Sequence, residues 1–218
     1  MLFANGIQKK YGQLDILKGV DLRIDSGEIV SIVGSSGAGK TTLLQILGTL
    51  ERPDSGTLEI AGVNPFKLSA KELSNFRNQS LGFIFQFHQL LPEFSALENA
   101  MLPALIGGKS KKEAEELARP LLKKLGIEDR SEHKPSELTG GEQQRVAVCR
   151  ALINSPKIIF ADEPSGNLDT KNARELHELF FQLRDEFKQT FVIVTHNEEL
   201  AQMADRGLVM RDGRFVNQ

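Results

Sequence analysis

Apolar positions recur with two different periods along the chain. Over the first 25 residues they alternate with polar ones, which predicts strands over 2–11 and 20–25 with a turn near Gly12. Later runs are almost continuously apolar, as in strands that are buried on both faces of a parallel sheet. These predicted strands cover 28–33, 81–86, 157–162 and 190–195.

The middle of the chain has helical periodicity instead. No strand pattern occurs from 87 to about 135, whereas helices are predicted over 95–105 and 110–125. The second of these helices carries an apolar stripe made of Ala114, Leu117, Ala118, Leu121, Leu122 and Leu125. A helical segment is therefore expected between two regions of β pattern.

Local signals predict the remaining elements. A helix over 69–78 begins at a capping box of Ser69 and Glu72, and a second helix covers 170–187. The second helix places these apolar residues in register: Ala173, Leu176, Leu179, Phe180, Leu183 and Phe187. The turn signal Asp212-Gly213 predicts a hairpin between the last two strands.

Composition indicates an ordinary globular protein. The 218 residues are 40% hydrophobic and 26% charged, with a net charge of -2, which gives no basic surface for a nucleic-acid backbone. Because Cys149 is the only cysteine, no internal disulfide is possible, and a reducing compartment is expected. The sequence shows neither a signal peptide nor a membrane span, so a protein working at a membrane would need a partner there.

The first apolar run, 28–33, leads directly into a glycine-rich motif. It fits the phosphate-loop pattern G-x-x-x-x-G-K-[ST] with Gly34, Ser35, Ser36, Gly37, Ala38, Gly39, Lys40 and Thr41. Such a loop points backbone N–H groups at phosphate, and the following helix adds the positive end of its dipole. We expect Lys40 to reach the β- and γ-phosphates, the Thr41 hydroxyl to bind Mg²⁺, and Thr42 to belong to the same site. The alternative is a chance glycine turn, which the flanking strand and helix disfavour.

Two adjacent carboxylates end the strand predicted over 157–162. This arrangement resembles the second motif of phosphate-loop ATPases. Asp162 is predicted to hold Mg²⁺ through its shell, and Glu163 to polarise the attacking water. In isolation, an Asp-Glu pair that opens a loop would be the simpler interpretation, and the upstream phosphate loop reverses that preference.

The most specific motif is L-T-G-G-E-Q-Q-R at 138–145, which leads into an apolar helix. Two glycines at a helix start expose backbone donors and make a second anion site. Here the chain resembles the ATP-binding-cassette (ABC) family, whose signature reads L-S-G-G-x-Q-x-R. Thr139 replaces the usual serine and keeps a hydroxyl. The resemblance covers essentially the whole chain.

This resemblance implies an α/β fold with a RecA-like phosphate-loop NTPase core, an antiparallel β subdomain and an inserted α-helical subdomain. The expected organisation is one domain over 1–218. The nucleotide-binding core and β subdomain would comprise 1–86 and 157–218, and the helical subdomain with the signature would comprise 87–156.

Further site residues carry over from the family. Gln86 matches the Q-loop glutamine, which senses Mg²⁺ and the attacking water, and His196 matches the switch histidine, which contacts the γ-phosphate. The stretch S-G-N-L-D at 165–169 looks like the D-loop, and Asp169 is counted with the nucleotide site. Tyr11 lies where the family keeps an aromatic that stacks on adenine, although a plain strand aromatic is the alternative. His88, His133 and His177 match no catalytic position, so we expect surface or packing roles for them.

The family also implies partners. Thr139, Gly140 and Gly141 would complete the nucleotide pocket of a second copy, so that two ATP molecules are sandwiched between the copies. A permease would dock beside Gln86, in an apolar stretch made of Phe83, Phe85, Phe87, Leu90, Leu91 and Phe94. Nucleic acid is not an expected partner, and the chain is expected as a peripheral protein on the cytoplasmic face of the inner membrane.

The stretch from F-H-Q-L-L-P at 87–92 to Glu98 and Asn99, together with Asn167, resembles the branch that serves lipoprotein release and macrolide or peptide efflux. The expected function is an ATPase that powers a permease, with lipoprotein release as the first choice. Macrolide or peptide efflux and a non-transport role in cell division are the alternatives. Soluble cassette proteins of translation or DNA repair usually need two cassettes or a long coiled coil, for which 218 residues leave no room.

Overall fold

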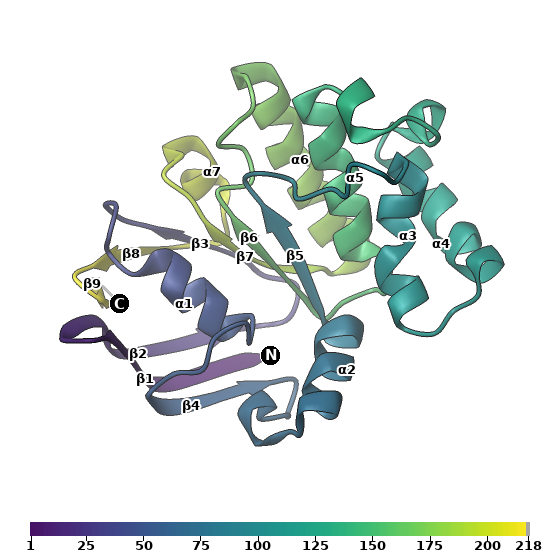
Figure 1. The fold of residues 1–218 in the computed structure, drawn as a ribbon. Helices are drawn as coiled ribbons and strands as arrows, with labels where there is room; N and C mark the ends of the chain where they lie inside the picture. The colour runs from purple at the N-terminus through teal and green to yellow at the C-terminus, as the bar shows by residue number, and fades with distance from the viewer. Residues whose placement is uncertain (217–218) are drawn as a thin grey trace.

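The computed structural model describes residues 1–216, and its strands form two sheets (Figure 1). The larger sheet has the strand order β5-β6-β7-β3-β8-β9, in which β9 alone runs antiparallel to its neighbour. Its strands are β3 (Ile29–Val33), β5 (Leu81–Phe85), β6 (Ile158–Asp162), β7 (Thr190–Val194), β8 (Arg206–Arg211) and β9 (Arg214–Val216). The continuous apolar runs therefore do form the buried parallel strands predicted from them.

The smaller sheet is antiparallel, with the order β2-β1-β4. It comprises β1 (Leu2–Tyr11), β2 (Leu14–Ile24) and β4 (Ser55–Ile60), and β1 alternates buried and exposed residues as predicted. β2 begins earlier than the pattern suggested, because 14–19 pair with β1 through bulges that disturb the alternation. The predicted α/β class with an antiparallel part is confirmed.

Each face of the parallel sheet has its own hydrophobic core. Side chains of α1 (Lys40–Leu47) and of the antiparallel sheet pack against one face, to which β6 contributes Ile158 and Phe160. The next residues along β6, Ile159 and Ala161, point to the other face and pack with helices α3 to α7. These helices are α3 (Ala96–Ile106), α4 (Lys111–Lys124), α5 (Gly140–Leu152), α6 (Thr170–Phe187) and α7 (Glu198–Met203).

Four α-helices begin at capping boxes, which fix where the chain turns helical. The predicted pair Ser69 and Glu72 starts α2 (Ala70–Ser80). The same arrangement, with a glutamate three residues after the cap, starts α3, α4 and α5. No strand lies between β5 and β6 in the described chain, as the sequence predicted, and the division into subdomains stays a prediction.

The predicted apolar stripes are wider than the surfaces that are buried. Leu117 of α4 is 39% exposed, because it lies at the edge of a stripe whose centre is Ala114, Ala118 and Leu122. Phe187 is 52% exposed, because it is the last residue of α6, and the Lys124 ammonium lies 4.7 Å from its ring centroid. No helix among residues 1–216 combines the length and apolarity that a membrane crossing needs.

Phe180 tests the core between α6 and β7. It is fully buried, and its ring centroid lies 5.1 Å from that of Phe191. We expect Phe180→Ala to lower the free energy of unfolding by about 3–5 kcal/mol, because it removes buried contacts and leaves a cavity. Phe187→Ala, on the same helix, is the matched control and should cost less than about 1 kcal/mol. Urea denaturation measures both, and equal losses would contradict the burial pattern.

Candidate active site

The carboxyl ends of four neighbouring strands, β5, β6, β7 and β3, open into one cavity of about 480 Å³. Parallel strands place the loops that follow them at the same edge of the sheet, which is why segments far apart in sequence meet there. Each of these strands is followed by a predicted site segment. The cavity is lined by Ile16, Gly34, Ser36, Gly37, Gly39, Lys40, Thr41, Thr42, Gln86, Glu163, Val194 and His196.

The glycine-rich loop has a preformed shape. Gly39 is left-handed, with φ 100°, and caps α1, which begins at Lys40. The Lys40 ammonium donates to the carbonyls of Gly34 and Ser35, at 2.8 and 3.1 Å. A side chain at position 34 would place its Cβ 2.2 Å from the carbonyl oxygen of Met210, so β8 closes one wall of the loop. Ala38 is buried, whereas Ser35 and Ser36 are exposed at the mouth.

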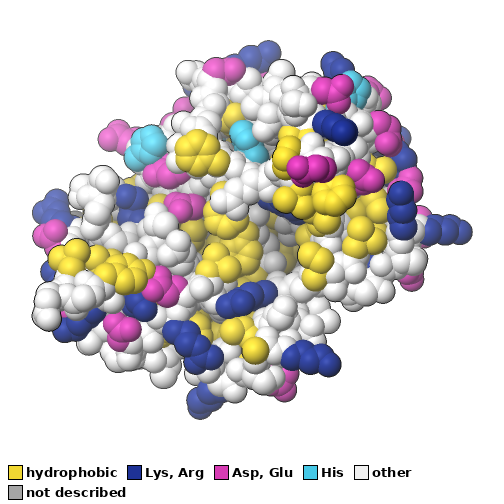
Figure 2. All heavy atoms as spheres, viewed as in Figure 1, with side chains coloured by type: hydrophobic (Ala, Val, Ile, Leu, Met, Phe, Trp, Pro, Cys, Tyr) yellow, Lys and Arg dark blue, Asp and Glu magenta, His cyan; other side chains and the backbone are white. Residues whose placement is uncertain are grey.

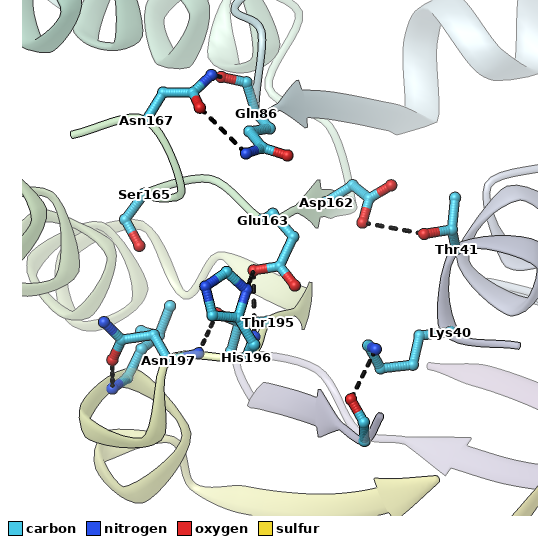
Figure 3. Close-up of polar contacts among 12 residues, drawn as sticks. Lys40, Thr41, Gln86, Asp162, Glu163, Ser165, Asn167, Thr195, His196 and Asn197 are labelled. Carbon is cyan, nitrogen blue, oxygen red and sulfur yellow. Dashed lines mark hydrogen bonds and ion pairs between the residues drawn. The ribbon is translucent and has the colours of Figure 1, made fainter. Parts of the chain in front are cut away.

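Oxygen atoms that could be ligands of Mg²⁺ lie close together beside this loop (Figure 3). The Thr41 hydroxyl donates to Asp162 Oδ1 at 3.4 Å, and burial raises the pKa of the Asp162 carboxyl. Gln86, at the end of β5, lines the same cavity and supplies an amide oxygen. Among residues 1–216, no three His, Cys, Asp or Glu side chains cluster as a protein-only metal cage. A hydroxyl, a carboxylate and an amide oxygen beside the loop fit an ion that takes oxygen ligands and binds phosphate, as Mg²⁺ does.

Glu163 is held in an unusual backbone conformation. Its φ is 46°, and its N–H donates to the Val194 carbonyl at 2.8 Å, so the strand pairing extends into the loop. Its Oε2 accepts from His196 Nδ1 at 2.9 Å and from the His196 backbone N–H at 3.1 Å. The Glu163 side chain is 19% exposed and that of His196 is 72% exposed. The partly enclosed Glu163 carboxylate can orient a water molecule, and the exposed His196 imidazole beside it can reach a ligand.

Asn167, in the predicted D-loop, lies against Gln86, a contact that the sequence did not predict. Gln86 Nε2 donates to Asn167 Oδ1 at 3.1 Å, and Asn167 Nδ2 donates to the Gln86 carbonyl at the same distance (Figure 3). Two residues upstream, the Ser165 hydroxyl lies 3.0 Å from Nε2 of the buried His177. No sequence signal joins positions 86 and 167, because only the folded sheet brings their loops together.

The signature residues lie apart from the phosphate loop. Thr139 caps α5, where its hydroxyl accepts from the Glu142 N–H at 3.3 Å and donates to Glu142 Oε2 at 2.9 Å. Hydrogen bonds from the backbone N–H and hydroxyl of Thr139 lower the pKa of Glu142. Gly140 and Gly141 lie beside Leu168 and Asn172, at the D-loop and the start of α6. Of the described residues that line the phosphate-loop cavity, none comes from 139–141, a separation that suits a site completed by another copy.

Two predicted site residues lie at the periphery. Tyr11 ends β1 and is 48% exposed, while its hydroxyl donates to Glu51, which raises the Tyr11 pKa. The Lys9 ammonium lies 5.5 Å from the ring centroid. Asp169 caps α6 by accepting from the Asn172 N–H at 2.9 Å, which lowers its pKa. Of the other histidines, His88 is half-buried. The only cysteine, Cys149, is buried.

Comparison with known proteins gives relatives over the full length. A family model described as ABC transporter matches residues 17–166. The chain is 62% identical over 213 residues to the lipoprotein-releasing system ATP-binding protein LolD of Bacteroides thetaiotaomicron, with 98% of each chain covered. It is 63% identical over 215 residues to the protein of the same name from Porphyromonas gingivalis, with 99% of this chain and 98% of that one covered.

Solved structures agree in fold. The dimeric structure of MJ0796, a bacterial ABC transporter cassette, matches with a TM-score of 0.91 and 38% identity over 100% of this chain and 97% of that chain. A dimeric post-hydrolysis state of MJ0796 bound to ADP and Pi matches with a TM-score of 0.90, 38% identity and the same coverage.

The burial of His177 makes the free energy of unfolding depend on pH. Burial lowers its pKa below the ordinary 6.5, so the unfolded chain binds this proton at a higher pH than the folded chain. The contribution to stability is therefore complete above pH 6.5 and is lost as the pH falls through the lowered pKa. We expect His177→Gln, which can still hydrogen-bond Ser165, to flatten the fall in unfolding free energy between about pH 7 and pH 5. Urea denaturation across this range measures it, and an unchanged slope would refute the assignment.

Proposed function

The chain belongs to the ABC transporter family, and we propose that it is the ATP-binding subunit of a lipoprotein-releasing system, in which ATP hydrolysis powers a membrane permease. The observation that carries this proposal is the single cavity into which the phosphate loop, Gln86, Glu163 and His196 all open. The near full-length identity to LolD proteins supports lipoprotein release as the task.

In the proposed reaction, ATP and water give ADP and phosphate. The loop N–H groups and Lys40 bind the phosphates, and this binding fixes the γ-phosphate relative to Glu163. Glu163 accepts a hydrogen bond from the attacking water, while His196 holds the carboxylate in place through the 2.9 Å contact. Mg²⁺, which Thr41 and Gln86 would hold with Asp162 in its outer shell, would supply charge neutralisation of the phosphates.

The second anion site implies a pair of chains. We place Thr139, Gly140 and Gly141 against the nucleotide of a second copy, as in an isologous dimer with two shared sites. Support comes from the separation of these residues from the phosphate loop within one chain and from the dimeric assembly of MJ0796. Tyr11 and Asp169 would complete the site, as a base-stacking ring and an interface residue.

We place the docking surface for the permease at a hollow beside Gln86. Figure 2 shows hydrophobic side chains gathered over β5 and beside α3, where cavities of about 380 and 360 Å³ adjoin. Phe87 and Ile106 are 72% and 74% exposed at its rim. Arg150 of α5 donates to the carbonyls of His88 and Gln89, at 2.7 Å each, which fixes the segment that follows β5.

We propose that an amphipathic helix of the permease occupies this hollow, because exposed aromatic and aliphatic side chains over a rigid floor suit such a helix. Of the apolar residues expected here, Phe83 packs partly against one core and forms floor rather than contact surface, whereas Leu90 packs partly against the other core and lines neither cavity. Docked in this way, the chain would be peripheral on the cytoplasmic face of the inner membrane. The permease rather than this chain would select the lipoprotein.

Glu163→Gln tests the hydrolytic site. We expect it to lower ATP turnover at least about a hundred-fold, because the general base is lost, while ATP binding is retained. With saturating ATP and Mg²⁺, the variant should then accumulate as a dimer, which light scattering after size-exclusion chromatography measures. Lys40→Ala is the control that should neither bind ATP tightly nor dimerise. A Glu163→Gln variant that stays monomeric at saturating ATP would contradict the shared site.

Reconstitution tests the transport task. The chain should co-purify with a membrane permease and, in proteoliposomes, drive ATP-dependent release of a lipoprotein into solution. Glu163→Gln in the same complex is the matched control and should release none. If the wild-type complex hydrolyses ATP and exports a macrolide or a peptide while the lipoprotein stays bound, the efflux alternative replaces lipoprotein release.

A further inference from the structure

We propose that Asn167 is a positioning residue that sets the orientation of the Gln86 side-chain amide, so that its oxygen faces the metal and nucleotide. This inference rests on the proposed function, in which Gln86 is a Mg²⁺ ligand. It concerns a contact between two loops, since Gln86 follows β5 and Asn167 lies in the loop that follows β6. The two residues exchange hydrogen bonds of 3.1 Å in both directions.

The pairing leaves only one favourable orientation for the glutamine amide. The NH₂ group of Asn167 donates a hydrogen bond to the backbone carbonyl of Gln86. The Gln86 side chain therefore faces the other end of the Asn167 amide, which is the acceptor Oδ1. An amide oxygen accepts hydrogen bonds and cannot donate them. If the Gln86 amide were rotated by half a turn, Oε1 would face Oδ1 and two acceptors would oppose each other. Asn167 therefore selects the orientation with Nε2 toward itself.

This orientation matters because only one end of the amide can bind a cation. Figure 3 shows Gln86 Nε2 directed at Asn167 and Oε1 directed away from it, on the side where Asp162 and Thr41 lie. Mg²⁺ takes oxygen ligands, and an amide NH₂ presented in the same place would repel it. Partners that orient a metal ligand are part of the site's affinity, even though they touch neither metal nor substrate.

The D-loop is built to receive the glutamine. A Cβ at Gly166 would lie 2.8 Å from Gln86 Nε2 and 3.1 Å from its Cδ, so a glycine there leaves the room in which the amide lies. The loop is anchored at this glycine and at the residue before it. The Gly166 N–H donates to the Glu163 carbonyl at 3.0 Å, and Ser165 contacts the buried His177. Asn167 thus presents its amide from a fixed backbone.

The test measures metal affinity rather than turnover. In the Glu163→Gln background with saturating ATP, the affinity for Mn²⁺ is followed by the electron paramagnetic resonance signal of the free ion. We expect Asn167→Ala to weaken Mn²⁺ binding about ten-fold, as loss of an orienting partner does. Gln86→Ala should weaken it at least as much. The double variant should be no weaker than Gln86→Ala alone, because Asn167 acts only through Gln86.

A second readout needs neither metal nor nucleotide. In the free protein, the side-chain NH₂ resonances of Gln86, assigned by their absence in Gln86→Ala, should shift to the positions of a free amide in Asn167→Ala. Asn64→Ala removes a helix-capping asparagine at a distant turn and serves as the control, with Mn²⁺ affinity and Gln86 resonances as in the parent. Thermal unfolding of every variant shows that the fold is retained.

The outcomes separate this proposal from the function it rests on. Unchanged Mn²⁺ affinity in Asn167→Ala, or a double variant weakened by the product of the single effects, overturns the positioning role and leaves the ATPase proposal standing. Failure of the parent Glu163→Gln protein to bind Mn²⁺ in an ATP-dependent way overturns both, and identifies the proposed function as the premise that failed.

Discussion

The hydrogen-bonded register of the parallel sheet is the constraint on which the site depends. Phe85, Asp162, Val194 and Ile32 lie in one row across β5, β6, β7 and β3. One or two residues beyond that row come Gln86, Glu163, His196 and Gly34, so these predicted site residues leave the sheet at the same height. A slip of one residue in any strand would also exchange its two faces between the two cores, which opposes such a slip strongly. Packing and site geometry are thus enforced by the same register.

Those parts of the fold and site that are encoded locally could be predicted from the sequence. Continuous apolar runs identified β3, β6 and β7, and the glycine motif with its flanks identified the loop before α1, because neither depends on distant contacts. Contacts between loops could not be predicted. The pairing of Gln86 with Asn167 spans 81 positions and needs the folded sheet, and the exposure of Phe187 depends on where α6 ends.

The backbone conformation of Glu163 helps to fix the direction of its carboxylate. A non-glycine residue with φ 46° is less stable than an extended one by about 1–3 kcal/mol and persists where its surroundings over-determine it. Here the surroundings are the hydrogen bond to Val194 and the two from His196 to the carboxylate. The carboxylate is therefore aimed by the backbone and not by side-chain rotation alone.

In the capping box of α5, the Glu142 carboxylate competes with a nucleotide phosphate of the proposed dimer for the same hydrogen-bond donors. The Thr139 hydroxyl and N–H are already bonded to the Glu142 carboxylate of the same chain. A phosphate arriving from a second copy would find these donors occupied by an anion, so it must displace that carboxylate or share its partners. The free energy gained when the two copies close is then the difference between the interaction of these donors with phosphate and their interaction with the Glu142 carboxylate. It is smaller than the full strength of the new hydrogen bonds. When that phosphate left, the Glu142 carboxylate, three residues along the same helix, would be at hand to take these donors again.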